Sequence, residues 1–97
     1  MDHEWRPMSD DEFEARLIGQ RIRLARKKRR WSMKKLAGFL GISYQQVQKY
    51  ESGRNFISLR WLLRICRAFD VSPLWFLPGS YAVMAEGVEG ERGGDWS

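Results

Sequence analysis

The chain has 97 residues, with 17 lysines and arginines against 12 aspartates and glutamates, so its formal net charge is +5. This length allows one small domain whose core is only marginally sufficient by itself. A single cysteine excludes an intramolecular disulfide, and no apolar run reaches the roughly 18 residues of a membrane span, so we expect a soluble, cytoplasmic domain.

The charge is unevenly distributed along the chain. Residues 1–15 hold six acidic and one basic residue, residues 16–60 hold thirteen basic and one acidic residue, and residues 61–97 hold five acidic and three basic residues. The middle segment alone therefore carries a net charge of +12. Such a block is typical of proteins that bind a polyanion, because each neutralised phosphate releases condensed counterions. A solvated surface that only keeps the protein in solution is the alternative interpretation.

The chain begins with a predicted flexible arm over residues 1–9, where no periodicity is visible. His3 has no second ligand at a suitable spacing, so we expect no metal site there. Ser9 and Glu12 have the spacing of a capping box, and the acidic residues around them suit the positive end of a helix dipole. A helix is therefore predicted from about residue 10 to about Arg30, with Gly19 as a mild weakness.

Two short helices joined by a tight turn are predicted over residues 32–52. Ser32 is an N-cap type of residue, and the apolar residues after it have the spacing of a buried helical stripe: Leu36, Ala37 and Leu40. Gly41 stands where a helix end favours a left-handed residue, and Ser43 offers a second N-cap. Trp31, just before the first cap, is expected to pack into the core.

The second of these helices has an outward face made almost wholly of amide and ammonium groups. Val47, Tyr50 and the stem of Glu51 face the expected core, whereas the opposite side carries Gln45, Gln48, Lys49 and Ser52. Glutamine can present a donor and an acceptor to the edge of an adenine, and lysine can donate to guanine. We therefore predict that residues 43–52 form a recognition helix for a DNA major groove.

Two further helices complete the predicted domain. Ser58 caps a helix over Leu59–Phe69, and Ser72 with Pro73 opens a short helix that runs through Leu77. The longer helix is expected to close the core with one apolar face: Leu59, Leu62, Ile65, Cys66 and Phe69. Because Cys66 lies inside this stripe, we interpret it as a small buried hydrophobic residue rather than a reactive thiol.

The chain contains more aromatic residues than a core of this size can hold. Trp61, Leu63 and Trp75 are therefore predicted to be exposed and to form a subunit interface on the last two helices, with Phe39 or Phe56 as further exposed candidates. Residues 79–97 are rich in glycine and acidic residues and are predicted to be a disordered tail. The alternative is that Trp96 and the run Tyr81–Met84 add a short interface segment, and the tail could also bind a protein partner.

The run GISYQQVQKYESGRNFIS resembles the helix-turn-helix of the phage lambda repressor and Cro type, the regulator family often called XRE-like. The similarity extends over about residues 16–78. It implies an all-α, five-helix, lambda-repressor-like DNA-binding domain over residues 10–78, here with an N-terminal helical extension and a flexible C-terminal tail. It further implies a transcriptional regulator, most often a repressor, that binds double-stranded operator DNA as a homodimer and needs no cofactor.

The resemblance also assigns roles to particular residues. It places Tyr44, Gln45 and Lys49 against DNA bases, to which the outward face adds Gln48, and it pairs Arg26 with Glu51 in an ion pair. Gly38 and Phe39 depart from the polar helix formers usual in the family, and Met33 replaces a common glutamine or serine. The residues expected to contact the DNA backbone are Arg30, Met33, Lys34, Lys35, Gln46, Ser52, Arg54 and Asn55; a plain turn role is the alternative for Asn55.

Two other functions are compatible with the same residues. The chain could be the DNA-binding antitoxin of a toxin–antitoxin pair, or it could be an interaction module that keeps the fold but binds only proteins. An enzyme is not expected, because the sequence has no paired acid–base set, metal-ligand spacing or phosphate-cradling glycine loop.

Overall fold

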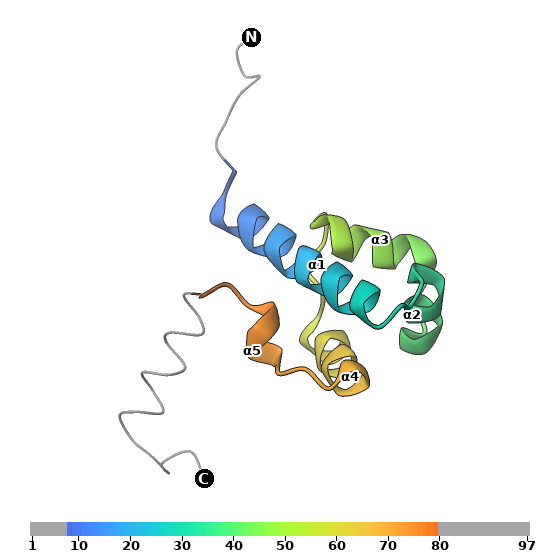
Figure 1. Cartoon of the computed structure of the whole chain (residues 1–97). Helices are drawn as coiled ribbons and strands as arrows, with labels where there is room; N and C mark the ends of the chain where they lie inside the picture. The colour runs from blue at the N-terminus through green and yellow to red at the C-terminus, as the bar shows by residue number, and fades with distance from the viewer. Residues whose placement is uncertain (1–7, 80–97) are drawn as a thin grey trace, which may run out of the picture.

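The computed structural model describes residues 8–79, and this part of the chain forms five α-helices without any strand (Figure 1). The predicted all-α fold class is therefore confirmed. The predictions for residues 1–7 and 80–97, which cover most of the arm and the tail with Tyr81–Met84 and Trp96, lie outside the described residues. The helices are α1 (Asp10–Lys28), α2 (Met33–Leu40), α3 (Tyr44–Ser52), α4 (Leu59–Phe69) and α5 (Pro73–Phe76).

A serine begins every helix. Its hydroxyl oxygen accepts a hydrogen bond from a backbone N–H of the first turn, which satisfies one of the donors that a helix start leaves unpaired. The five caps are Ser9, Ser32, Ser43, Ser58 and Ser72, and the Ser9 cap is a complete capping box with Glu12. The predicted helix starts are confirmed by these bonds.

Helix ends agree less closely with the sequence prediction. Gly41 and Gly53 close α2 and α3 with φ angles of 76° and 81°, a left-handed geometry that glycine adopts without strain. Helix α1 ends at Lys28, two residues before the predicted end, because Arg30 turns to a φ of 62° and the Trp31 N–H donates to the Arg26 carbonyl. Helix α5 ends at Phe76, one residue before the predicted Leu77.

Helix α1 runs through the middle of the molecule, with α3 along one side, α2 near its C-terminal end, and α4 and α5 on the other side (Figure 1). It packs against both α3 and α5, and α2 packs against α3 and α4. The start of α1 and the end of α5 both lie on the side of the molecule away from the turn between α2 and α3 (Figure 1).

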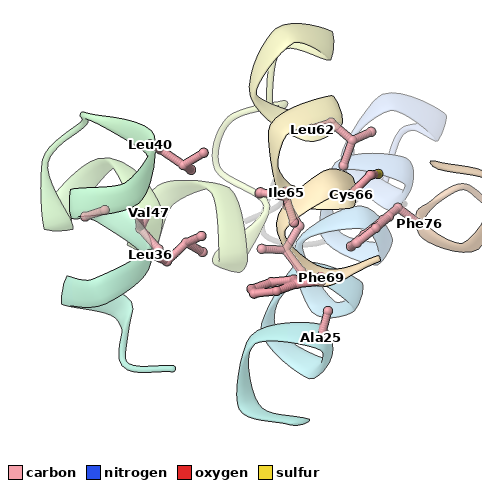
Figure 2. Packing of buried hydrophobic residues seen from close by; sticks show 11 residues of the cluster. Ala25, Leu36, Leu40, Val47, Leu62, Ile65, Cys66, Phe69 and Phe76 are labelled. Carbon is pink, nitrogen blue, oxygen red and sulfur yellow. The ribbon is translucent and has the colours of Figure 1, made fainter. Parts of the chain in front are cut away.

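All five helices contribute to one hydrophobic core (Figure 2). The predicted apolar stripe of α2 is buried, as is that of α4 apart from Leu59. Trp31 packs edge-on against Phe69 with ring centroids 5.0 Å apart, which confirms its predicted place against the core. The prediction for Leu59 is wrong: its side chain is 68% exposed, because the first turn of α4 extends beyond the core. The buried core residues shown in Figure 2 include Ala25, Leu36, Leu40, Val47, Leu62, Ile65, Cys66, Phe69 and Phe76.

Helices α1 and α3 approach each other so closely that two positions in the contact require glycine. A Cβ atom on Gly19 would lie 2.3 Å from the Tyr50 carbonyl oxygen, and one on Gly53 would lie 2.5 Å from Cγ of Arg16. Gly19, which the sequence presents only as a weakness in a helix, is thus the point where the backbone of α3 rests on α1. This contact fixes where α3 lies relative to α1.

Candidate nucleic-acid interface

Helix α3 is held from its inner side by a buried ion pair. The Arg26 Nε–Glu51 Oε2 distance is 2.7 Å, and the Arg26 Nη2–Glu51 Oε1 distance is 3.0 Å, so two parallel hydrogen bonds join the planar groups. The remaining Nη1 of Arg26 donates to the Trp31 carbonyl oxygen at 2.8 Å. Both charged side chains are more than nine-tenths buried. The pair that the family resemblance implies is therefore present, and it connects α1, α3 and the segment before α2.

The outer side of α3 presents polar groups to solvent. Gln45, Gln48 and Lys49 are exposed, and Tyr44 is half-buried at the start of the helix. The Gln48 Nε2 donates to the Tyr44 hydroxyl at 3.2 Å, which orients two of the predicted base-reading side chains relative to each other. Ser52 donates from its hydroxyl to the Lys49 carbonyl oxygen at 3.3 Å, so it also closes the helix end.

A surface hollow of about 650 Å³ lies between α3 and the C-terminal half of α1. Three of the predicted base contacts, Gln45, Gln48 and Lys49, line it from α3. Two predicted backbone contacts, Ser52 at the end of α3 and Arg54 in the following loop, line it as well. Arg23 and Lys27 line it from α1. Both residues belong to the basic segment of residues 16–60, but the sequence gave no signal that they lie beside α3, because only the packing of α1 on α3 brings them there.

Three of the predicted backbone contacts lie in the first turn of α2. Lys34 and Lys35 are exposed, and the Lys35 ammonium lies 4.6 Å from the centre of the Trp31 ring. The hydroxyl of Ser32 already accepts from the Lys35 N–H. Met33 is half-buried and packs against the core. Because a thioether has no N–H or O–H to donate, only the backbone of Met33 suits a phosphate, and its side chain does not.

The other predicted backbone contacts lie at the ends of α1 and α3. Arg54 and Asn55 have exposed side chains, while their backbone N–H groups both donate to the Lys49 carbonyl oxygen, at 2.9 and 3.3 Å. The turn role that was the alternative for Asn55 is therefore present at its backbone. Gln46 is half-buried and Arg30 is exposed beyond the end of α1.

The predicted subunit interface is only partly exposed. Leu63 and Trp75 are 39% and 41% exposed, as the aromatic surplus predicts, and Phe39 and Phe56 are exposed as well. The prediction that Trp61 is exposed is wrong: it is half-buried against the core. The guanidinium groups of Arg60 and Arg64 lie 5.1 and 4.9 Å from its ring centre, so their side chains cover the part that the core leaves open.

Cys66 is buried in the core, and burial raises the pKa of its thiol above the ordinary value of 9.0. This environment favours the neutral thiol and agrees with a packing role. Within residues 8–79, no three His, Cys, Asp or Glu side chains gather closely enough to hold a metal ion. No helix in the same part of the chain is both long and apolar enough to cross a membrane.

The capped pair α2 and α3, with a polar helix held outward by a buried ion pair, defines a helix-turn-helix domain. Residues 22–76 match the helix-turn-helix family HTH_3, more than half of the chain, so the chain belongs to this family. The resemblance to lambda-repressor-type, XRE-like regulators is thereby confirmed.

Known proteins similar to this chain include transcriptional regulators, one of which was solved in complex with DNA. The HTH-type transcriptional regulator y4wC of Sinorhizobium fredii is 41% identical over 59 residues, which cover 61% of this chain and 41% of the relative. The restriction-modification controller protein C.AhdI of Aeromonas hydrophila is 28% identical with a TM-score of 0.60, over 65% of this chain and 96% of that one. The P22 c2 repressor, solved in complex with a synthetic operator, is 29% identical with a TM-score of 0.58, over 64% and 94%.

The curated relatives are longer than this chain. The chain spans 18%, 41% and 50% of the length of three of them. The shared part is the helix-turn-helix domain, so the similarity concerns this domain and not the remaining parts of those proteins.

Proposed function

We propose that the chain is a sequence-specific regulator of transcription that binds double-stranded DNA through a domain over residues 10–78. The observation that carries this proposal is the outward face of α3, where Gln45, Gln48 and Lys49 line one hollow with basic side chains of α1 and Arg54. Amide and ammonium groups on an exposed helix suit base edges, and the surrounding cations suit the phosphates on either side of a groove. The operator complex of the similar P22 c2 repressor supports this function.

The two kinds of contact divide between α3 and its surroundings. Tyr44, Gln45, Gln48 and Lys49 read base edges, and the bond between Gln48 and Tyr44 holds part of this set in place before DNA binds. The groups that hold phosphates determine affinity and its dependence on salt, but carry little sequence information. They are Arg30, Lys34, Lys35, Gln46, Ser52, Arg54, Asn55 and the backbone N–H of Met33.

The regulator binds as a homodimer and represses by occupying an operator that overlaps a promoter. Exposed Leu63 and Trp75 supply apolar surface for joining two copies, and a core of this size gains from burial between subunits. Two copies related by a dyad place their α3 helices in successive major grooves about 34 Å apart, which requires an inverted-repeat operator.

The decisive experiment is selection of binding sites from random duplexes with the full chain. We expect an inverted repeat whose half-site centres are about 10 base pairs apart. Fluorescence anisotropy on the selected duplex and on a scrambled duplex should then differ in Kd by at least about a thousandfold at physiological salt. Recovery of no motif, with equal binding to both duplexes, would contradict sequence-specific recognition. A motif without dyad symmetry would contradict the homodimer.

A further inference from the structure

Helix α1 has an apolar face that no other described element covers. Phe13, Leu17 and Leu24 fall on one stripe at 3.6 residues per turn, opposite the buried side that carries Ile22. Phe13 and Leu24 are 55% and 58% exposed. The helix begins at Asp10, twelve residues before the family match begins at residue 22, so Phe13 and Leu17 belong to a part of α1 outside that match.

The two ends of this stripe differ in shape and charge. At its C-terminal end, Leu24 borders a hollow of about 860 Å³ that Val71 and Trp75 also line. Three basic residues, Lys27, Lys28 and Arg29, and one acidic residue, Asp70, complete the charged lining, so its net charge is positive. At its N-terminal end, Phe13 projects next to the acidic first turn, which consists of Asp10, Asp11 and Glu12. One end of the helix therefore offers an exposed aromatic ring beside acidic groups, and the other offers an apolar hollow beside basic groups.

We propose that this face docks on the same face of a second copy of the chain, with the two α1 helices antiparallel. A twofold axis near residues 18–19 places Phe13 of each copy against Leu24 and into the hollow beside Trp75 of the other copy. The same axis places Asp10 of each copy opposite Lys28 of the other. A parallel arrangement would instead bring the acidic turns together, so charge selects the antiparallel one.

The helix dipole accounts for acidic residues at the start of α1 and basic residues at its end, but not for an exposed Phe13 and Leu24. An exposed apolar stripe whose large aromatic residue matches an apolar hollow is the arrangement of a self-complementary interface with a central anchor. This surface shares Trp75 with the proposed α4–α5 dimer surface, whereas Leu63 on α4 does not line its hollow. A chain that uses both surfaces can join dimers on neighbouring operators, so that one bound dimer assists the next.

Disulfide cross-linking tests the geometry without DNA. In a Cys66→Ala background, one protein carries Phe13→Cys and a second, distinguished by a size tag, carries Leu24→Cys. After the two are mixed in equal amounts and oxidised, we expect the 13–24 heterodimer to exceed either homodimer by about tenfold. Homodimers in excess would overturn the antiparallel arrangement, and absence of any cross-linked dimer would overturn the docking itself.

Charge reversal tests the pairing through the self-association constant, measured by sedimentation equilibrium. Asp10→Lys and Lys28→Glu should each weaken association about threefold to tenfold, and the two changes together should restore it. The combined variant has the least favourable helix-dipole charges, so restoration cannot come from a more stable helix; circular dichroism checks that α1 remains folded. Failure of the combined variant to recover would overturn the proposed pairing.

Two further variants separate this surface from other occupants and from the proposed function. If residues 80–97 of the same chain fill the hollow instead, the 13–24 cross-link is absent from the full chain and appears when those residues are removed, which would overturn the proposal. Leu63→Ser should leave the 13–24 cross-link unchanged while it weakens dimeric binding to the operator. Unchanged operator binding by Leu63→Ser would contradict only the proposed α4–α5 dimer, whereas loss of the 13–24 cross-link in the parent chain would contradict only the α1 docking.

Discussion

The two sides of helix α3 make different kinds of contact. The inner side consists of buried Val47, the Arg26–Glu51 pair and a backbone contact with Gly19, each with a specific partner on another element. The outer side consists of exposed Gln45, Gln48 and Lys49, whose contacts within the described chain are few. The position of α3 and its proposed recognition of DNA therefore depend on different residues. Changes on the inner side should alter stability, whereas changes on the outer side should alter DNA binding.

The largest effect is expected from breaking the inner ion pair. Glu51→Ala leaves the Arg26 guanidinium buried without a carboxylate, which should lower the free energy of unfolding by about 3–5 kcal/mol. Urea unfolding followed by circular dichroism measures this change. As a control, the double variant Arg26→Met/Glu51→Leu removes both charges and should recover most of the loss. A single variant as stable as the parent chain would show that the pair does not hold α3.

The close contact of α1 with α3 should be the next most sensitive feature. Gly19→Ala places a Cβ atom against the Tyr50 carbonyl oxygen, which cannot move without shifting α3, so we expect a loss of about 3 kcal/mol. Gly38→Ala is the matched control, because nothing lies within 4 Å of the added atom. That change should stabilise α2 by about 0.5–1 kcal/mol. Thermal unfolding of the two variants should therefore shift in opposite directions.

Substitutions on the outer side should leave unfolding unchanged and separate two kinds of DNA contact. Lys49→Ala should cost roughly 1–3 kcal/mol of discrimination at one base pair per half-site. Arg54→Ala should weaken binding to the operator and to the scrambled duplex alike. It should also reduce the slope of log Kd against log salt concentration by about one per half-site, because one fewer phosphate is neutralised. Anisotropy titrations at several salt concentrations measure both changes. Equal losses on both duplexes for Lys49→Ala would contradict its role as a base contact.

The smallest effect on stability is expected from ionisation of the buried Cys66 thiol. Burial raises the pKa of Cys66 above 9.0, so above this pH the thiol ionises in the unfolded chain while it stays protonated in the folded one. The free energy of unfolding should therefore fall as the pH rises past 9. In Cys66→Ala this contribution is absent, so the stability difference between the two proteins should shrink by about 1 kcal/mol or less at about pH 10. A constant difference across this range would contradict the raised pKa.

The sequence predicts local features of this molecule well and spatial contacts poorly. The serine caps and the closing glycine at position 41 could be predicted because their bonds join residues two to five apart. The requirement for Gly19 was not, since it depends on carbonyl groups about thirty residues away. Leu59 follows the apolar periodicity of α4, yet its side chain is exposed. Periodicity predicts which face of a helix is buried, but not how many turns of that face the other helices cover.

The candidate site divides in the same way. The outward face of α3 could be predicted from residue spacing, and the Arg26–Glu51 pair from the family resemblance. The presence of Arg23 and Lys27 at the same hollow could not, because it follows from how α1 crosses α3. Trp61 was misjudged because the number of aromatic residues says nothing about the arginine side chains that cover its ring.

The start of α1 and the end of α5 both lie away from the turn between α2 and α3 (Figure 1). A fluorescent protein or an affinity label joined directly to residue 8 or to residue 79 would therefore leave the described domain on the side remote from this turn. Such fusions allow the occupancy of an operator to be followed in living cells or captured from them. A label at the C-terminus is preferable, because one at the N-terminus is closer in sequence to Phe13.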